Sequence, residues 1–307
     1  MYLGEKVDLL ITYVNYKDKA WQADYEQTAH TKVNPAMMER FRSFGTLRYL
    51  LRGIDNFMPY VDRVILIVSA LSQVPKWVDQ NKVKIVVHDD YIPAIKTPTF
   101  NSCTIETFFY RIKDLNPYII YTNDDTYPLK ESVAEDFFTN GIPNAHFKFY
   151  TKIPRDNMFR TQCKNGADMI FNALKEHNLV TKENPVFFKP DHCMTALKRD
   201  TLDAVGKLCG DSMYKTTTPF RSMLNVNQHI YLYYQYFIGN YVEQATDYEY
   251  ATFSNGLDYI CDHIRKPKHA FMCLNDSGLT SYEYDNAKEI VQNALRALLP
   301  EKSRFEK

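Results

Sequence analysis

The chain has 307 residues, of which 45% are hydrophobic and 24% are charged, a composition typical of a globular protein. Lysine plus arginine balance aspartate plus glutamate at 37 each, which argues against a dedicated nucleic-acid-binding surface. No stretch approaches the roughly 18 to 20 uninterrupted apolar residues that a membrane-spanning helix needs, so we expect no membrane span. The length fits either one elaborated α/β domain or two fused lobes.

The N-terminal segment and the cysteines favour a cytoplasmic protein. Residues Met1–Lys6 show no basic segment followed by an apolar stretch and a small-residue cleavage site, so no signal peptide is predicted. The six cysteines are scattered without a C-x-x-C pair, which supports neither a zinc ribbon nor a redox motif. We therefore expect reduced thiols.

The first 140 residues alternate strand-like and helix-like segments. Apolar runs rich in valine and isoleucine predict strands, and apolar residues three or four apart predict helices. In chain order the predicted elements are strand Val7–Val14, helix Phe44–Phe57, strands Val61–Ser69 and Val83–Val87, helix Cys103–Ile112 and strand Ile119–Tyr121. This order predicts a largely parallel sheet with covering helices.

Beyond about residue 140 the pattern becomes more irregular. Helical spacing predicts helices at Ala167–Glu176, Asn227–Phe237 and Tyr284–Leu299, the last as a closing element. The final residues, Ser303–Lys307, are expected to be frayed, so that the tail after Lys302 would be dispensable.

The run Tyr118–Asp125 is the strongest chemical signal in the chain. An apolar strand ends there in two adjacent carboxylates, Asp124 and Asp125. Carboxylates at the carboxyl end of a strand offer hard oxygen ligands where the crevice of an α/β sheet opens, and a divalent cation held there can bind a nucleotide diphosphate. The alternative is an acidic turn after a buried strand.

Four separated blocks of the chain resemble the characteristic regions of the Stealth proteins, which transfer sugar-1-phosphate from nucleotide-activated sugars. The first block is Asp8–Asn15 with Asp18 and Trp21. The second comprises Phe41–Ser43, Leu47–Arg52, Pro75–Trp77, His88–Asp90, Pro98–Ser102, Ile105–Glu106, Arg111–Ile112 and Asn123–Asp125. The third contains Asp191–His192 and Phe220–Ser222, and the fourth is Cys273–Asp276. The blocks follow the expected order over nearly the whole chain.

The resemblance implies a fold and an activity. It implies a Rossmann-like, glycosyltransferase-A-like α/β core at 1–140 that binds the nucleotide sugar, and a mainly helical part at 141–307 that completes the site of one catalytic unit. It also implies transfer of sugar-1-phosphate, from a UDP-hexose or UDP-N-acetylhexosamine, to a glycan hydroxyl in capsule or surface polysaccharide synthesis. Nucleoside monophosphate would leave. Such a role is compatible with peripheral association at the inner face of the plasma membrane.

The resemblance also implies catalytic and metal-binding residues. Asp125 and Asn275 are the expected ligands of Mg²⁺ or Mn²⁺, although an Asn-Asp pair such as Asn275-Asp276 is otherwise typical of a turn. His192 is the expected proton-transfer residue, because imidazole titrates near neutrality. Arg221 would bind phosphoryl oxygens through its planar fork, and Asp124 would assist catalysis.

Further residues are expected to bind substrate. Asp8, Thr12 and Asn15 lie along or just past the first strand, with a capped strand and turn as the alternative. Asn101, Ser102 and Glu106 form a polar segment that leads into a helix and would contact sugar or phosphate, or would simply cap the helix. Arg160 is a further phosphate candidate, with Arg155 as an equal rival. Arg48 and Arg52 lie four apart on a predicted helix, where a solvated face is the default.

Two other functions remain open from the sequence. A metal-dependent glycosyltransferase would attack the anomeric carbon and release nucleoside diphosphate. A carbohydrate- or nucleotide-binding module would hold a structural cation at the Asp-rich loop, but it has no need of a histidine and arginines from distant blocks.

Overall fold

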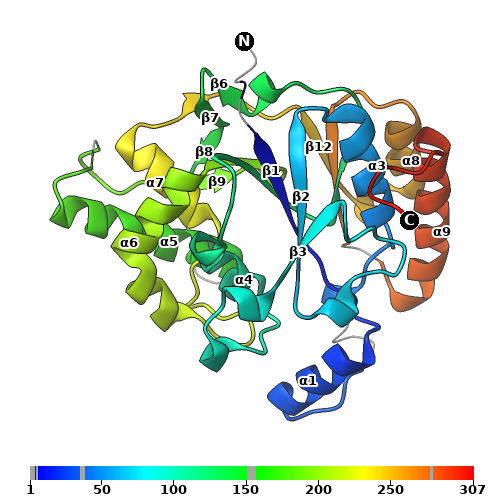
Figure 1. Ribbon diagram of the computed structural model, residues 1–307, viewed down its shortest axis with the longest axis horizontal. Helices are drawn as coiled ribbons and strands as arrows, with labels where there is room; N and C mark the ends of the chain where they lie inside the picture. Colours follow the sequence, from blue (N-terminus) through cyan, green and yellow to red (C-terminus); the bar gives the residue numbers. More distant parts are fainter. Residues whose placement is uncertain (1–3, 5, 35–38, 151–156, 181, 277–278) are drawn as a thin grey trace.

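The computed structural model describes residues 4, 6–34, 39–150, 157–180, 182–276 and 279–307. A five-stranded sheet with the order β10-β4-β1-β2-β3 runs through its centre (Figure 1). The strands are β1 (Val7–Thr12), β2 (Val61–Val68), β3 (Val83–Val87), β4 (Tyr118–Asn123) and β10 (Thr195–Lys198). Strands β1 to β4 are parallel, and β10 joins the edge antiparallel to β4.

Strand β1 is central because both of its faces are covered. Its side chains alternate between two buried clusters, with Leu9 and Ile11 in one and Leu10 in the other. Strand β2 pairs with one edge of β1 and β4 with the other, so the strand order reverses at β1. Ligand sites of open α/β sheets lie at such a switch point, outside the carboxyl ends of the strands.

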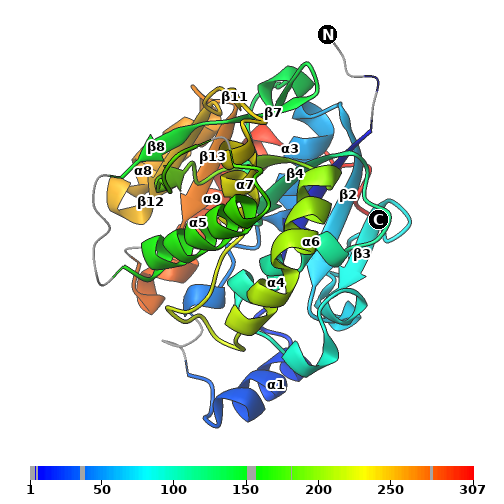
Figure 2. The same cartoon turned by 90° about the vertical axis from the view of Figure 1, so that its left-hand side faces the viewer.

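Two layers of helices cover the sheet (Figures 1 and 2). One layer contains α3 (Leu47–Phe57), α8 (Leu257–Arg265) and α9 (Ser281–Leu298). The other contains α5 (Met158–Glu176), α6 (Arg199–Thr216) and α7 (His229–Ile238). Each of the two large buried clusters includes residues from both sides of residue 140, so the two parts of the chain share their cores. None of the described helices is long and apolar enough to cross a membrane.

A small sheet fixes the chain just after the acidic pair. Its order is β12 (Tyr248–Thr252), β13 (Phe271–Asn275) and β5 (Thr126–Pro128). The backbone N–H of Leu274 donates to the carbonyl oxygen of Asp125 at 2.9 Å, which brings the end of β13 beside the end of β4. Gly53 of α3 permits this packing, because a Cβ there would lie 2.6 Å from the carbonyl oxygen of Pro128.

Shorter elements complete the fold. They are α1 (Lys19–Ala29), η1 (Glu39–Phe41), α4 (Ser102–Thr107), η5 (Phe109–Arg111), β6 (Phe138–Thr139), β7 (Ile142–Ala145), β8 (Phe147–Phe149), β9 (Phe188–Pro190) and β11 (Val242–Glu243). Helix α1 lies beyond the carboxyl ends of the parallel strands (Figures 1 and 2). The predicted α/β, Rossmann-like class is confirmed.

The prediction of a frayed C-terminal tail was wrong. Phe305 is buried, and its carbonyl oxygen accepts a hydrogen bond from the N–H of Asp79 at 2.8 Å. Glu306 forms ion pairs with Arg52 at 2.7 Å and Arg48 at 3.1 Å. Arg52 is therefore buried against the tail rather than part of a solvated face.

Candidate functional site

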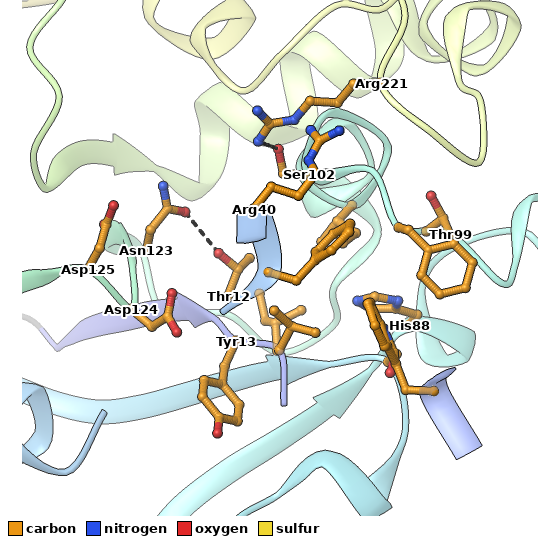
Figure 3. A pocket seen from close by; sticks show the side chains of 17 residues that line it. Thr12, Tyr13, Arg40, His88, Thr99, Ser102, Asn123, Asp124, Asp125 and Arg221 are labelled. Carbon is orange, nitrogen blue, oxygen red and sulfur yellow. Dashed lines mark hydrogen bonds between the residues drawn. The ribbon is translucent and has the colours of Figure 1, made fainter. Parts of the chain in front are cut away.

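A cavity of about 320 Å³ opens at the carboxyl ends of β1 and β4. Thr12 lines it from the end of β1, and Asn123, Asp124 and Asp125 line it from the end of β4 (Figure 3). The carboxyl ends of two adjacent parallel strands thus supply one edge of the cavity, as expected at a switch point.

A buried chain of polar groups fixes the end of β4. The Thr12 hydroxyl donates to Asn123 Oδ1 at 3.0 Å. The Tyr121 hydroxyl lies 2.7 Å from both Asn123 Oδ1 and Glu106 Oε1. Burial raises the pKa of Glu106 to about 7. These contacts hold the side chain that directly precedes the two carboxylates.

The carboxylates of Asp124 and Asp125 repel each other. Burial, and then the neighbouring charge of Asp125, raise the pKa of Asp124 to about 7. Burial also raises the pKa of Asp125, while His192 opposes that shift, with its Nε2 4.0 Å from Asp125 Oδ2. Two adjacent carboxylates in a low-dielectric site repel each other, and a bound cation would relieve that repulsion.

Two guanidinium groups line the cavity together with these carboxylates. Figure 3 shows Arg40 and Arg221 near each other beside Ser102, apart from Asp124 and Asp125. Arg221 Nη2 donates to Ser102 Oγ at 2.6 Å. Burial, followed by the charge of Arg221, lowers the pKa of Arg40. Arginine pairs of this kind bind phosphate oxygens well, because each fork carries several donors and a permanent charge.

Asn101 positions the arginine without entering the cavity. Its side chain is buried and accepts from the N–H of Cys103 at 3.1 Å, which caps α4. Its amide also donates to the carbonyl oxygen of Thr218 and to Asn225 Oδ1, each at 3.0 Å. Asn101 therefore connects the segment that carries Arg221 to the start of α4. It caps this helix, which was the alternative to substrate binding.

Aromatic rings form a wall of the same cavity. The ring centroids of Trp21 lie 5.1 Å from Phe41 and 5.2 Å from Phe100, and all three residues line the cavity. Phe100 also stacks on Phe220 at 5.5 Å. His88 lines the cavity as well, and burial lowers its pKa to about 4, so its ring is neutral at physiological pH. This wall can hold a flat, uncharged group.

A second cavity of about 340 Å³ adjoins the first. The residues that line both cavities are Arg40, Asn123, Asp124, Asp125 and Arg221. The second cavity adds polar side chains from four stretches of the chain: Arg42, Ser43, Thr46, Tyr127, His192, Asn275 and Asp276. The carboxylates and guanidinium groups therefore lie where the two cavities meet.

The second cavity also contains the candidate metal ligands. The carboxylates of Asp124 and Asp125 and the amide oxygen of Asn275 are hard donors that suit Mg²⁺ or Mn²⁺. Arg42 pairs with Asp276, with one contact at 3.0 Å, and so holds the chain that follows Asn275.

The structure brings seven of the predicted residues to these cavities. They are Thr12, Ser102, Asp124, Asp125, His192, Arg221 and Asn275. Glu106 lies behind the first cavity and acts through Tyr121 and Asn123. The prediction that Glu106 and Asn101 contact substrate is therefore corrected, because their polar atoms are occupied within the protein.

Three other predicted residues lie elsewhere. Asp8 is the second residue of β1, at the opposite end of the strand from the cavity, and its buried carboxylate binds Arg63 at 2.7 and 2.8 Å. Asn15 accepts from the N–H of Lys17 and forms a turn.

Arg160 does not line either cavity, and its guanidinium lies over the Tyr150 ring at 4.5 Å. Its rival Arg155 falls outside the described residues.

The sequence analysis did not identify Arg40, and it assigned no role to His88 or the aromatic wall, although these residues lie within the matched blocks. Arg40 directly precedes the matched run Phe41–Ser43, but its importance depends on its proximity to Arg221, far away in the sequence. Only the fold reveals that pairing.

Comparison with known proteins adds a family relationship. Residues 40–145 match the family model for Stealth protein CR2, conserved region 2. The capsular polysaccharide phosphotransferase WcwK of Streptococcus pneumoniae is 27% identical, and the match covers 99% of this chain and 98% of that protein. An exopolysaccharide phosphotransferase of Lactiplantibacillus plantarum is 25% identical over 98% of this chain and 96% of that protein.

Among solved structures, the galactosyltransferase LgtC, in complex with donor and acceptor sugar analogs, covers 93% of this chain and 95% of its own. Its identity is 10% and its TM-score is 0.43, a likeness too weak to support a conclusion.

Proposed function

We propose that this chain belongs to the Stealth family and transfers sugar-1-phosphate from a nucleotide sugar to a glycan hydroxyl in capsule or exopolysaccharide synthesis. Similarity to two polysaccharide phosphotransferases over nearly their whole lengths supports this reaction class. The observation that carries the proposal is the meeting of two cavities at a pair of carboxylates and a pair of guanidinium groups.

The first cavity is the proposed donor site. Its aromatic wall suits a nucleoside base, and Thr12 and Ser102 offer hydroxyl groups to the sugar or phosphates. Arg40 and Arg221 would hold the diphosphate at the junction of the cavities. From the family resemblance, we favour a uridine nucleotide carrying a hexose or N-acetylhexosamine as the donor. The same resemblance favours a cytoplasmic location beside the inner face of the plasma membrane.

The second cavity is the proposed acceptor site. His192 lines it but not the first cavity, so its imidazole is placed to take the proton of an acceptor hydroxyl. Asp124, Asp125 and Asn275 would hold Mg²⁺ or Mn²⁺ between the two sites. When bound, the ion would neutralise charge on the transferred phosphoryl group.

The proposed transfer forms and breaks one bond each at the sugar-bearing phosphorus. The acceptor oxygen bonds to that phosphorus, the bond to the bridging oxygen of the diphosphate breaks, and nucleoside monophosphate leaves with the electron pair. His192 takes the acceptor proton, while Arg40 and Arg221 stabilise the phosphoryl oxygens. The anomeric C–O bond is untouched, so the sugar keeps its stereochemistry.

The leaving group tests the proposal directly. The enzyme is incubated with Mg²⁺, a panel of nucleotide sugars labelled in the sugar-bearing phosphate, and glycan acceptors. We expect nucleoside monophosphate in step with a product that contains the label. Stoichiometric nucleoside diphosphate with unlabelled product would instead show a metal-dependent glycosyltransferase.

Asp125→Asn tests the site in the same assay, with Asp8→Asn as its matched control. Loss of one charged ligand should reduce turnover by at least about 100-fold while the protein remains folded. Asp8→Asn changes a carboxylate at the far end of β1 and should lower stability rather than turnover, because it disrupts the ion pair with Arg63. Equal turnover losses in folded samples of both variants would contradict the site.

A further inference from the structure

We propose that Asp125, His192 and Cys273 form a site for a thiophilic divalent cation such as Zn²⁺, and that its occupation inhibits the enzyme. One ligand atom from each of the three residues lies within 4.8 Å of the others. The three residues come from separate parts of the chain: the turn after β4, the segment before β10, and strand β13.

Cys273 is the buried ligand of this site. Cys273 is fully buried and pairs in antiparallel register with Thr126, the residue after Asp125. The side chains of His192 and Asp125 are 35% and 30% exposed, and both line the second cavity. An ion can therefore reach the two exposed ligands from the cavity and then contact the thiol beneath them.

The geometry needs only small side-chain movements. Tetrahedral Zn²⁺ with bonds of about 2.0 to 2.3 Å separates its ligand atoms by about 3.3 to 3.8 Å. The His192–Asp125 contact is 4.0 Å, and the widest separation in the group is below 4.8 Å. A rotation that moves each ligand atom by less than about 1 Å would close the site and leave a fourth position open toward the cavity.

The ligand chemistry separates this site from the proposed magnesium site. Mg²⁺ takes oxygen ligands, whereas an imidazole nitrogen and a thiolate sulfur favour Zn²⁺ or Cd²⁺. The bound ion would displace the thiol proton to solvent, since a metal-bound cysteine is a thiolate. Binding would engage both Asp125 and the imidazole of His192. The expected inhibition rests on the proposed function, whereas the binding itself does not.

Cadmium binding tests the site without any substrate. The purified protein is titrated with Cd²⁺ while the ultraviolet charge-transfer band of a cadmium–thiolate bond is recorded, and calorimetry gives the stoichiometry. We expect one tight site with this band. Cys273→Ser should lose the band and bind at least about tenfold more weakly, because a hydroxyl is a poor ligand for this ion.

Cys193→Ser is the matched control. Cys193 adjoins His192 but lies outside the three-residue group, so this variant should keep the band. Absence of the band in the unmodified protein, or its persistence in Cys273→Ser, would overturn the proposal. If Cys273→Ser fails to fold, His192→Ala serves instead, and unchanged Cd²⁺ affinity in that variant overturns it equally.

Inhibition is measured separately in the transfer assay with Mg²⁺ present. The Zn²⁺ concentration that halves the rate should rise at least about tenfold in Cys273→Ser, with each protein compared with its own rate in the absence of zinc. Equal sensitivity of the two proteins would overturn the inhibitory role. Because the cadmium band needs neither donor nor acceptor, failure of this inference is distinguishable from failure of the proposed reaction.

Discussion

Arg40 and Arg221 are the residues whose placement most constrains the ligand. Two cationic side chains in a partly buried site repel each other, and Arg221 contributes to the lowered pKa of Arg40. A dianionic group between them would convert this repulsion into attraction. The two carboxylates that line the same cavities repel such an anion unless a cation lies between, which favours a metal-bound diphosphate over free phosphate.

Arg40→Ala should therefore impair transfer strongly. We expect a loss of about 100-fold in kcat/KM, because the phosphoryl oxygens lose a charged donor in both ground and transition states. Arg160→Ala is the matched control, since Arg160 covers the Tyr150 ring and lines neither cavity. Steady-state kinetics on both variants measure the contrast, and similar values for the two would remove Arg40 from the site.

Glu106 shows how a buried carboxyl can support the site from behind. Its pKa is raised to about 7 by burial, against an ordinary value of 4.5. A protonated Glu106 can donate to the Tyr121 hydroxyl, which is then free to donate to Asn123. The protonated form thus completes a hydrogen-bond chain that orients the residue before Asp124.

This raised pKa predicts a pH-dependent stability. Between about pH 4.5 and 7 the folded protein holds a proton on Glu106 that the unfolded chain has lost, so the free energy of unfolding should fall as pH rises. Glu106→Gln cannot ionise and should abolish this contribution, worth on the order of 3 kcal/mol.

Urea unfolding of Glu106→Gln and the unmodified protein at pH 5 and pH 8 measures the effect. The stability of Glu106→Gln relative to the unmodified protein should be higher at pH 8 than at pH 5. An identical stability difference at both pH values would show that Glu106 ionises normally.

At the scale of elements, the site depends on docking of the segment 217–225 against the start of α4. Asn101 contributes to that connection through Thr218 and Asn225. Arg221 and Ser102 then meet across the same junction. Helix α5 supports the same segment, since Gln162 donates to the carbonyl oxygen of Ser222 and Asn165 donates to those of Met223 and Asn225.

Asn101→Asp tests this docking. The carboxylate keeps an oxygen that caps α4 but loses the amide donors to the 217–225 segment. We expect kcat/KM to fall by at least about tenfold, and stability to fall by about 1 to 3 kcal/mol.

Asn144→Asp is the control, because Asn144 is also buried and its amide donates to the carbonyl oxygen of Glu135 at a site away from both cavities. If both variants lose stability and neither loses activity at low temperature, Asn101 is structural only.

The sequence predicted the elements whose apolar pattern is continuous. Strand β3 matches its predicted bounds, and β1, β2 and α9 differ only at their ends. Helix α6 was missed, because its buried positions alternate with many charged residues.

The helix predicted at Phe44–Phe57 begins at Leu47, and the one predicted at Cys103–Ile112 divides into α4 and η5. Single-sequence patterns locate elements more reliably than their ends.

The site was predictable where adjacent residues carry the chemistry. Asp124 and Asp125 are neighbours at a strand end, so their proximity is guaranteed by the chain. Asp8 was misassigned because it lies near the amino end of β1, and side chains at the amino end of a parallel strand lie on the edge opposite the ligand. The proximity of Arg40 and Arg221 is purely tertiary, so no local pattern could reveal it.

For the whole molecule, the two parts of the chain are joined by shared cores rather than by a linker. Leu9, Ile120, Phe271 and Val291 belong to one buried cluster, and Ile119, Phe171 and Tyr231 contribute to the other. Both faces of the central sheet are therefore covered by helices from beyond residue 140. This arrangement lets the late segments place His192, Arg221 and Asn275 around the early carboxylates.

The C-terminal tail belongs to the same cooperative unit. Phe305 fills a position in the cluster that includes α3 and α9. Arg52 binds Glu306 and also donates to the carbonyl oxygens of Leu299 and Pro300, at the end of α9. The tail therefore holds α3 and α9 together, close to where the chain ends in Figure 1.

A truncation after Lys302 should destabilise the protein without altering its chemistry. Loss of a buried phenylalanine costs about 3 to 5 kcal/mol, and Arg52 would in addition lose its buried ionic partner. Because no residue of 303–307 lines either cavity, kcat at low temperature should be retained. Thermal unfolding and kinetics of the truncated chain, with Lys302→Ala as a control at an exposed position, measure both effects. An unchanged unfolding temperature would mean that the docked tail contributes nothing to stability. A lower kcat in the folded truncation would mean that the packing of α3 against α9 affects the geometry of the site.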